Sequence, residues 1–224
     1  AGRYQETPQG AEKGLLIKVS DLAAGKAPAT KLTSNPLGDL HGDMAVGYKG
    51  QALRLANGAW SSDTVIETAL AGEDRWAVWT GGGATYLGGP QGTKVQAMMV
   101  CTAGSTGTAS CANHTGVSAT HGLGRLFGTL APTGQGPLWS VVMGNNAPED
   151  IYFNPGKGTS WSTNGPTGCR DSGNNPCANT PWNTYDLDGG GPDDVWVVGA
   201  GSGLLRYDGK GWQKATSVFY AASQ

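Results

Sequence analysis

The chain has 224 residues, of which 38% are hydrophobic and 14% charged, and its formal net charge is −2. This length can bury one substantial core, while the nearly balanced charge gives no footprint for nucleic acid. No apolar run approaches the ~20 residues that a membrane-spanning helix needs. Glycine supplies 38 residues, far above the usual ~7%, so we expect an all-β protein in which many turns separate short strands.

The chain begins with a polar segment. Residues 1–13 contain Pro and Gly, which predicts a flexible lead-in before a single domain at residues 14–224. Because the sequence starts at Ala1 without Met, we expect that a signal segment or a larger precursor has been removed. The first apolar stretch, residues 14–18 (GLLIK), matches residues 203–206 (GLLR). Nothing like Val-Trp-Val-Val precedes it, so we interpret it as half of a repeat unit.

The strongest pattern in the chain occurs twice. Residues 194–199 (DVWVVG) precede residues 204–209 (LLRYDG) and Trp212, while residues 43–47 (DMAVG) precede residues 53–58 (LRLANG) and Trp60. The step from Gly to Trp is thirteen residues in both copies, from Gly47 to Trp60 and from Gly199 to Trp212. We therefore predict an internal repeat of strand, turn, strand, Asp-Gly or Asn-Gly hairpin and strand.

Two looser copies complete the pattern. Residues 138–161 carry four extra residues between Gly144 and Trp161, and residues 74–89 lack a closing Trp. Residues 63–70 are the one short helical candidate, between the first full unit and the second.

This repeat predicts a β-propeller. Units of three or four short strands must stack to bury both faces, and stacking around an axis gives a propeller. Four full units and one shared by the two chain ends predict five blades of about 45 residues, closed by residues 218–221 pairing with residues 14–19. Six or seven blades stay open if the chain was cut from a longer parent, and an open β-sandwich is the structural alternative.

Residues 194–212 resemble the secreted bacterial propeller repeats related to the Asp-box kind, in which a DVWAVG strand precedes a GxILHYDG strand and a Trp. The match is close there, fair at residues 43–60 and loose elsewhere. Residues 154–161 (NPGKGTSW) echo an Asp-box hairpin, but Gly156 stands where the Asp is expected. The resemblance implies a fold and an exported location, and it implies no activity.

The cysteines indicate the compartment. Cys101 and Cys111 form one close pair in the sequence, and Cys169 and Cys177 form another. An even count in two close pairs favours two local disulfides among the three possible connectivities, and disulfides persist in secreted, periplasmic or cell-surface proteins. The spacings do not fit structural zinc sites.

Two predicted insertions, at about residues 100–124 and 162–183, carry these cysteine pairs. The second combines polar groups with an aromatic side chain, which suits recognition of sugar or peptide. A solvated loop held by its disulfide is the alternative. The candidate binding residues are Arg170, Asp171, Asn174, Asn175 and Trp182.

Calcium is a weaker possibility. Asp186, Asp188 and Asp193 alternate with Gly and Leu and carry the oxygen ligands that Ca²⁺ takes. The spacing of an EF-hand is missing, and turn formation already explains residues 192–194. We therefore expect no cofactor.

The sequence contains no G-x-S-x-G, H-E-x-x-H, phosphate-loop or dinucleotide motif. We therefore favour a non-catalytic binding or scaffold propeller, exported, that recognises carbohydrate or protein at the cell surface and can belong to a larger chain or assembly. The alternative is an extracellular carbohydrate hydrolase or lyase that gathers carboxylates at the propeller mouth.

Overall fold

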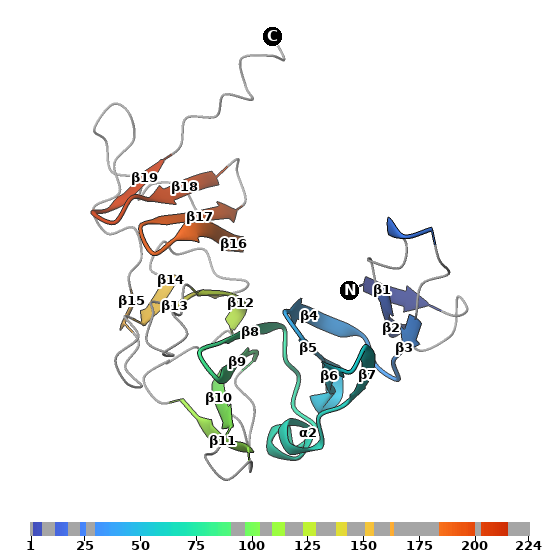
Figure 1. Cartoon of the computed structure of the whole chain (residues 1–224). Helices are drawn as coiled ribbons and strands as arrows, with labels where there is room; N and C mark the ends of the chain where they lie inside the picture. The colour runs from blue at the N-terminus through green and yellow to red at the C-terminus, as the bar shows by residue number, and fades with distance from the viewer. Residues whose placement is uncertain are drawn as a thin grey trace. The chain divides into compact units, whose positions relative to one another are not determined.

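The computed structural model describes residues 2–5, 12–17, 23–25, 30–90, 97–103, 109–114, 123–128, 138–142, 151–154, 162–163, 184–199 and 203–214. Within these ranges the strands form five antiparallel sheets, which confirms the all-β class (Figure 1). The chain divides into two compact units. One comprises Ala1–Thr80 with Ala84–Asn113, and the other comprises Gly81–Gly83 with His114–Gln224.

The first unit holds three sheets. Sheet A consists of β1 (Gly2–Gln5), β2 (Glu12–Ile17) and β3 (Thr30–Leu32). Sheet B consists of β4 (Leu37–His41), β5 (Met44–Gly47), β6 (Ala52–Ala56) and β7 (Ala59–Ser62), followed by helix α2 (Thr64–Leu70). Sheet C consists of β8 (Ala77–Gly81), β9 (Ala84–Gly88), β10 (Met98–Ala103) and β11 (Ala109–Asn113).

The second unit holds two sheets. Sheet D consists of β12 (Leu123–Gly128), β13 (Leu138–Val142), β14 (Ile151–Asn154) and β15 (Ser162–Thr163). Sheet E consists of β16 (Thr184–Gly191), β17 (Asp194–Gly199), β18 (Gly203–Tyr207) and β19 (Trp212–Lys214). In sheets B to E each strand pairs with the next one along the chain, so every sheet is a four-stranded meander.

The centre of sheet B is buried on both faces. Alternate side chains of a strand point to opposite faces, and all four residues of β5 are buried. On one face Ala45 and Leu53 pack with Leu16 and Leu37, toward sheet A. On the other, the cluster includes residues of sheet B, α2 and sheet C: Met44, Val46, Ala52, Ile66, Leu70, Val78, Leu87, Met99 and Cys101.

The second unit has an aromatic core between sheets D and E. Trp139 is fully buried, with its ring centroid 4.3 Å from that of Phe153, 4.9 Å from that of Tyr207 and 5.6 Å from that of Trp212. Aliphatic residues complete the cluster: Ile151, Leu187, Val195, Val197 and Leu205.

Two turns that the sequence predicts are present. Asn57 and Gly58 connect β6 to β7 with φ of 50° and 77°, the left-handed conformation that a tight hairpin of this kind needs. Between β18 and β19, Oδ1 of Asp208 accepts hydrogen bonds from the N–H groups of Lys210 and Gly211 at 2.9 and 3.0 Å. These bonds hold the pKa of the Asp208 carboxyl below its ordinary value.

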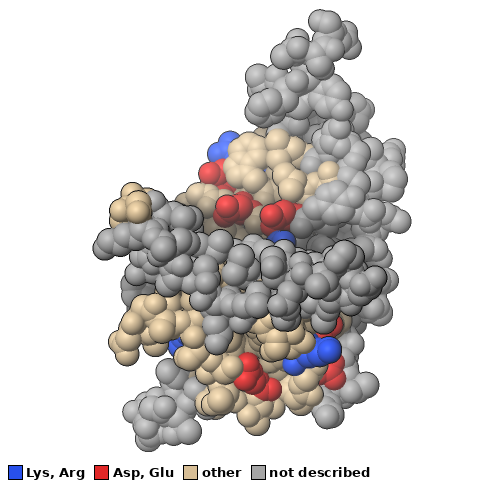
Figure 2. Space-filling view, turned by 90° about the vertical axis from the view of Figure 1, so that its right-hand side faces the viewer, with Lys and Arg blue, Asp and Glu red and all other residues tan. Residues whose placement is uncertain are grey.

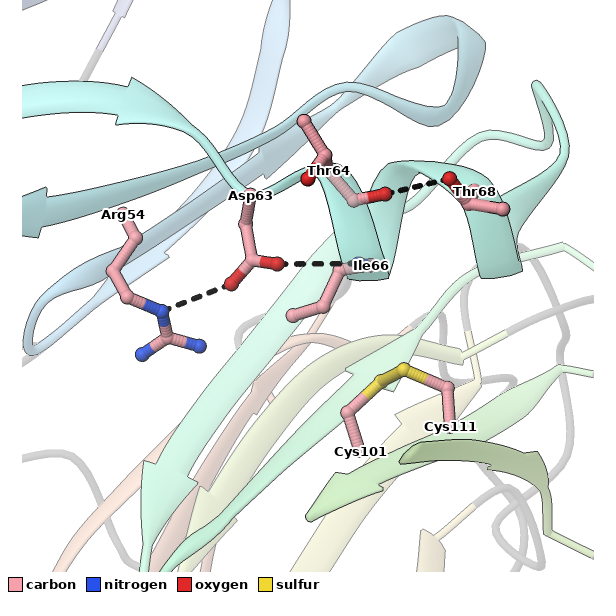
Figure 3. The surroundings of a disulfide bond; sticks show 7 residues. All are labelled: Arg54, Asp63, Thr64, Ile66, Thr68, Cys101 and Cys111. Atoms are coloured by element: carbon pink, nitrogen blue, oxygen red, sulfur yellow. Dashed lines mark hydrogen bonds and ion pairs between the residues drawn. A yellow bond between two sulfur atoms is a disulfide. The ribbon is translucent and has the colours of Figure 1, made fainter. Parts of the chain in front are cut away.

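Helix α2 confirms the helical candidate at residues 63–70. Asp63 caps it, since its Oδ1 accepts the Ile66 N–H at 3.2 Å while its Oδ2 accepts Nε of Arg54 at 2.9 Å (Figure 3). The helix ends at Ala71, which adopts the left-handed conformation with φ 52°. One carboxylate therefore joins the start of the helix to sheet B.

In both units, first strands of successive sheets are joined by side chains. Oδ2 of Asp39 on β4 accepts the Val78 N–H of β8 at 3.0 Å, and Nδ1 of His41 accepts the Thr80 N–H at 3.0 Å. In the second unit, Nε of Arg125 on β12 lies 3.3 Å from Oδ1 of Asp186 on β16. These contacts align the first strands of sheets B and C, and those of sheets D and E.

The N-terminus differs from the sequence prediction. The expected lead-in contains β1, whose Arg3 is paired with Gly14 of β2. On its other side β2 pairs with β3, with Leu15 opposite Leu32. Because both edges of β2 are occupied, the predicted pairing of residues 218–221 with this strand is wrong for residues 14–17. Residues 218–221 themselves lie outside the described part of the chain.

Sheet C corrects two further predictions. The predicted insertion at about residues 100–124 overlaps β10 and β11, which are the third and fourth strands of this sheet. The strand at residues 77–81 is at the edge of sheet C, whereas β5 and β17 have neighbours on both sides. The predicted repeat copy at residues 74–89 therefore equates the first strand of sheet C with the second strands of sheets B and E, which is wrong by one strand.

Candidate functional site: an exposed face of sheet E

The predicted binding loop lies outside the described residues. This applies to Arg170, Asp171, Asn174, Asn175 and Trp182, and to the cysteine pair Cys169 and Cys177. The pair Cys101–Cys111 is a disulfide, as predicted, and it joins directly opposed residues of β10 and β11. It lies near helix α2 (Figure 3), whose Ile66 and Leu70 belong to the same apolar cluster as Cys101.

The three calcium candidates have other contacts. Asp186 pairs with Arg125, and its Oδ1 also accepts the Leu187 N–H at 2.9 Å. Oδ1 of Asp188 accepts the Gly189 N–H at 2.8 Å, and Asp193 lies in the turn between β16 and β17. Over the described ranges, no three His, Cys, Asp or Glu side chains are grouped as ligands for a metal ion.

One face of sheet E combines apolar and charged side chains, and we call it the Trp196 face. Strand register places Asp188, Trp196 and Arg206 side by side on three adjacent strands. The neighbouring row contains Asp186, Val198 and Leu204. The Trp196 face therefore comprises Asp186, Asp188, Asp194, Trp196, Val198, Leu204, Arg206 and Gln213.

Asp194 holds the two largest side chains of this face in place. Its Oδ1 accepts Nε1 of Trp196 at 3.0 Å and Nε of Arg206 at 2.8 Å. The guanidinium carbon of Arg206 also lies 5.4 Å from the centre of the Trp196 ring, within the range of a cation–π contact. The indole and the guanidinium are thus fixed before any partner arrives.

The apolar centre of the Trp196 face is accessible. Val198 is 43% exposed, and Trp196 and Leu204 are half-buried. On the opposite face Val195 and Val197 are fully buried. A short apolar run such as residues 195–198 is typical of a buried strand, but here only one face of the strand is buried.

Sheet B presents the same arrangement in covered form. Met44 lies opposite Arg54 as Trp196 lies opposite Arg206, and Val46 lies opposite Ala52 as Val198 lies opposite Leu204. In sheet B the apolar members of these rows are fully buried, in one cluster with α2 and sheet C. The same kind of face thus forms a contact between sheets in the first unit.

The acidic residues of β16 also have counterparts in sheet B. Asp39 lies opposite Val46 and Asp186 opposite Val198, each next to a shift in register. His41 and Asp188 occupy the adjoining positions, opposite Met44 and Trp196. Since Asp39 and His41 bind the first strand of the next sheet, Asp188 lies where a partner sheet would be bound, while Asp186 is already paired with Arg125 of sheet D.

This face is suited to recognition by contact. Trp and Arg are enriched among the residues that dominate binding energy at protein interfaces, and an apolar centre within a polar rim is typical of such interfaces. On the side of the molecule drawn in Figure 2, the basic and acidic side chains of the described residues are interspersed. That view shows no extended basic surface.

The sequence signal that was missed is the alternation along β17. Trp196 and Val198 share a side with Asp194, and the two buried valines share the other. The Asp-Val-Trp-Val pattern has a charged residue on the same side as the aromatic one, which indicates a face with access to solvent.

No helix among the described residues is long and apolar enough to cross a membrane. A scan against protein-family models finds no match, and a search of curated proteins finds no relative of this chain.

Proposed function

We propose that the protein is an exported, non-catalytic scaffold built from blades of the β-propeller kind, and that it recognises another protein through the Trp196 face. The observation that carries the proposal is this face itself, in which a fixed Trp–Arg pair and an exposed Val198 lie on a regular sheet. The contacts between sheets support the blade architecture, and the disulfide supports export.

The blade architecture rests on contacts within each unit. A propeller places four-stranded sheets around a central channel, so the first strands of neighbouring blades approach one another. In the first unit Asp39 and His41 join the first strands of sheets B and C, and in the second unit Arg125 and Asp186 join those of sheets D and E. These contacts join sheets only within each unit, and the closed five-bladed ring expected from the sequence needs further contacts. A loss of monomer stability in Val198→Glu would support such a ring, because the Trp196 face would then be covered within one chain.

Export is supported by the Cys101–Cys111 bond. Structural disulfides form and persist in oxidising compartments and are rare in the cytosol. A secreted, periplasmic or cell-surface location is therefore part of the proposal.

A protein partner fits the Trp196 face better than a carbohydrate. Sugar sites are usually concave and bury most of the ligand, whereas this site is the face of a four-stranded sheet whose centre contains Val198 and Leu204 beside Trp196. In sheet B the matching residues are covered by other protein elements.

The proposal is tested by screening the purified chain against peptide and glycan arrays and against polysaccharides for cleavage. We expect binding in the protein class that Trp196→Ala abolishes. Val65→Ala serves as the control, because Val65 is 42% exposed on α2 and is not a residue of sheet E. Release of reducing ends or unsaturated products by the wild type, or glycan binding that Trp196→Ala leaves unchanged, would contradict the proposal.

A further inference from the structure

We propose that the Trp196 face binds a second copy of this chain, face to face, about a two-fold axis that runs parallel to the strands and passes over Trp196. The inference rests on the proposed scaffold function and names its partner. In such an isologous contact, each residue of one copy meets the same partner residue of the other copy in both directions.

Asp188 and Arg206 are placed for this symmetry, on either side of β17 in one row. The apolar centre on β17 is flanked by Asp186 and Asp188 on β16 and by Arg206 on β18. A two-fold axis along β17 places β16 of each copy over β18 of the other. Asp188 of one copy then meets Arg206 of the second, twice per dimer, and opposite charges face each other at both edges.

The donors and acceptors for this pairing are available at the surface. The side chain of Arg206 is 47% exposed, and only its Nε is used by Asp194, which leaves the outer guanidinium N–H groups for a partner carboxylate. Asp188 is exposed and uses Oδ1 for the N–H of Gly189. A carboxylate and a guanidinium pair strongly when they meet with two bonds.

The apolar centre supplies the contact area. Where sheet B has Met44 and Ala52, sheet E has the larger Trp196 and Leu204. In sheet B these positions are covered, whereas in sheet E Val198 is exposed. Because Asp194 already fixes Trp196 and Arg206, little side-chain entropy is lost on association.

Sedimentation velocity measures the association directly. We expect the wild type to form dimers as its concentration rises, and Val198→Glu to weaken the dimer by about 100-fold or more, since a charge is buried at its centre. Val65→Glu is the matched control, because Val65 has nearly the same exposed fraction, 42% against 43%. It should associate like the wild type.

Charge reversal separates the contact from a folding defect. Asp188→Arg alone places two arginines opposite each other, and Arg206→Asp alone places two aspartates opposite each other, so each variant should be monomeric. An equimolar mixture of the two variants restores both Asp–Arg pairs, and we expect it to form heterodimers at least about 10-fold more tightly than either variant forms homodimers.

Three results would overturn the inference. The first is a wild type that stays monomeric at the highest soluble concentration. The second is a mixture of charge-reversed variants that associates no better than the variants alone. The third is a Val198→Glu variant that loses stability as a monomer, which would mean that the face is covered within one chain, as in a closed ring. A monomeric wild type that still binds a protein through Trp196 would leave the scaffold function standing.

Discussion

Arg206 of β18 donates from Nε to Oδ1 of Asp194 at the start of β17, with the two atoms 2.8 Å apart. Arg54 makes the corresponding contact in sheet B, from its Nη1 to Oδ2 of Asp43 at 3.1 Å. Arg54 also binds Asp63, which caps α2, and Ile66 and Leu70 of that helix pack with the apolar residues of sheet B. The Arg–Asp contact is open to solvent in both sheets, whereas the apolar row beside it is covered in sheet B and exposed at Val198 in sheet E.

The closing tryptophans of sheets B and E are predicted to differ in their contribution to stability. Trp212 is 5% exposed and packs against Trp139 and Tyr207, with ring centroids 5.6 and 5.4 Å away. We expect Trp212→Ala to lower the free energy of unfolding by about 3–5 kcal/mol. Trp60 is half-buried, so Trp60→Ala should cost clearly less. Urea unfolding measures both, and equal costs would contradict this account.

These two residues show how far the sequence pattern reaches. The thirteen-residue step places both on the fourth strand, opposite Leu55 and Tyr207. The burial of each Trp depends on the side chains that the facing sheet places against it, and those side chains are distant in sequence. Trp212 meets the aromatic residues of sheet D, whereas Trp60 lies at the margin of a smaller aliphatic cluster.

His41 is predicted to hold sheets B and C together through its acceptor nitrogen. Its Nδ1 accepts the Thr80 N–H at 3.0 Å, and its ring stacks on Trp79 with centroids 5.2 Å apart. His41→Phe keeps a ring but removes the acceptor, and we expect it to cost about 1–3 kcal/mol. His41→Asn keeps an acceptor atom near the Nδ1 position. Unfolding curves should therefore show Asn closer to the wild type than Phe, and the reverse order would contradict this role.

The Cys101–Cys111 bond closes a short loop at a sequence separation of 10. Replacing both cysteines by Ala should lower the free energy of unfolding by about 2–3 kcal/mol, because the unfolded chain gains freedom. Alanine is the suitable replacement, since Cys101 is 5% exposed in an apolar cluster. A double variant as stable as the oxidised wild type would contradict the expectation. Peptide mapping without reduction also tests the predicted bond between Cys169 and Cys177.

His114 is predicted to make the protein sensitive to mild acid. It is 6% exposed, and burial lowers its pKa below the ordinary value. Below about pH 6.5 the unfolded chain therefore takes up a proton more readily than the folded one, so stability present above that pH is lost as the pH falls.

The urea concentration at the unfolding midpoint, measured between about pH 7.5 and 5, follows this loss of stability, because the range spans the ordinary histidine pKa. The decline should be shallower in His114→Asn than in the wild type, whatever the absolute stability of the variant. Parallel pH profiles would assign the acid sensitivity to other groups.

Local patterns predicted the central strands of sheets B and E, two hairpins, the short helix and the first disulfide, because turn residues, alternation and caps act within a few residues. Three features could be recognised only in the folded structure. Arg75 is fully buried, with its pKa lowered to about 10 by burial, although its sequence neighbours are Asp74 and Trp76. The strand at residues 2–5 forms in a polar segment because β2 offers it an edge.

The third feature is the Trp196 face. Its residues come from four strands, and its exposure depends on what covers the sheet. The steps to the following Arg and Trp are the same for the uncovered row around Trp196 and the covered row around Met44, and only the side of the strand on which the preceding Asp lies differs between them. Only the packing of sheets B and C makes the difference visible.

Hydroxyl-radical footprinting of Trp196 against Trp139 measures whether the Trp196 face is open in the single chain and covered on association. Both are tryptophans on second strands of their sheets, but Trp139 is fully buried and Trp196 is half-buried on an open face. We expect Trp196 to oxidise readily in dilute solution and to become protected as the concentration rises, while Trp139 stays protected throughout. Equal protection of the two residues in dilute solution would contradict this expectation.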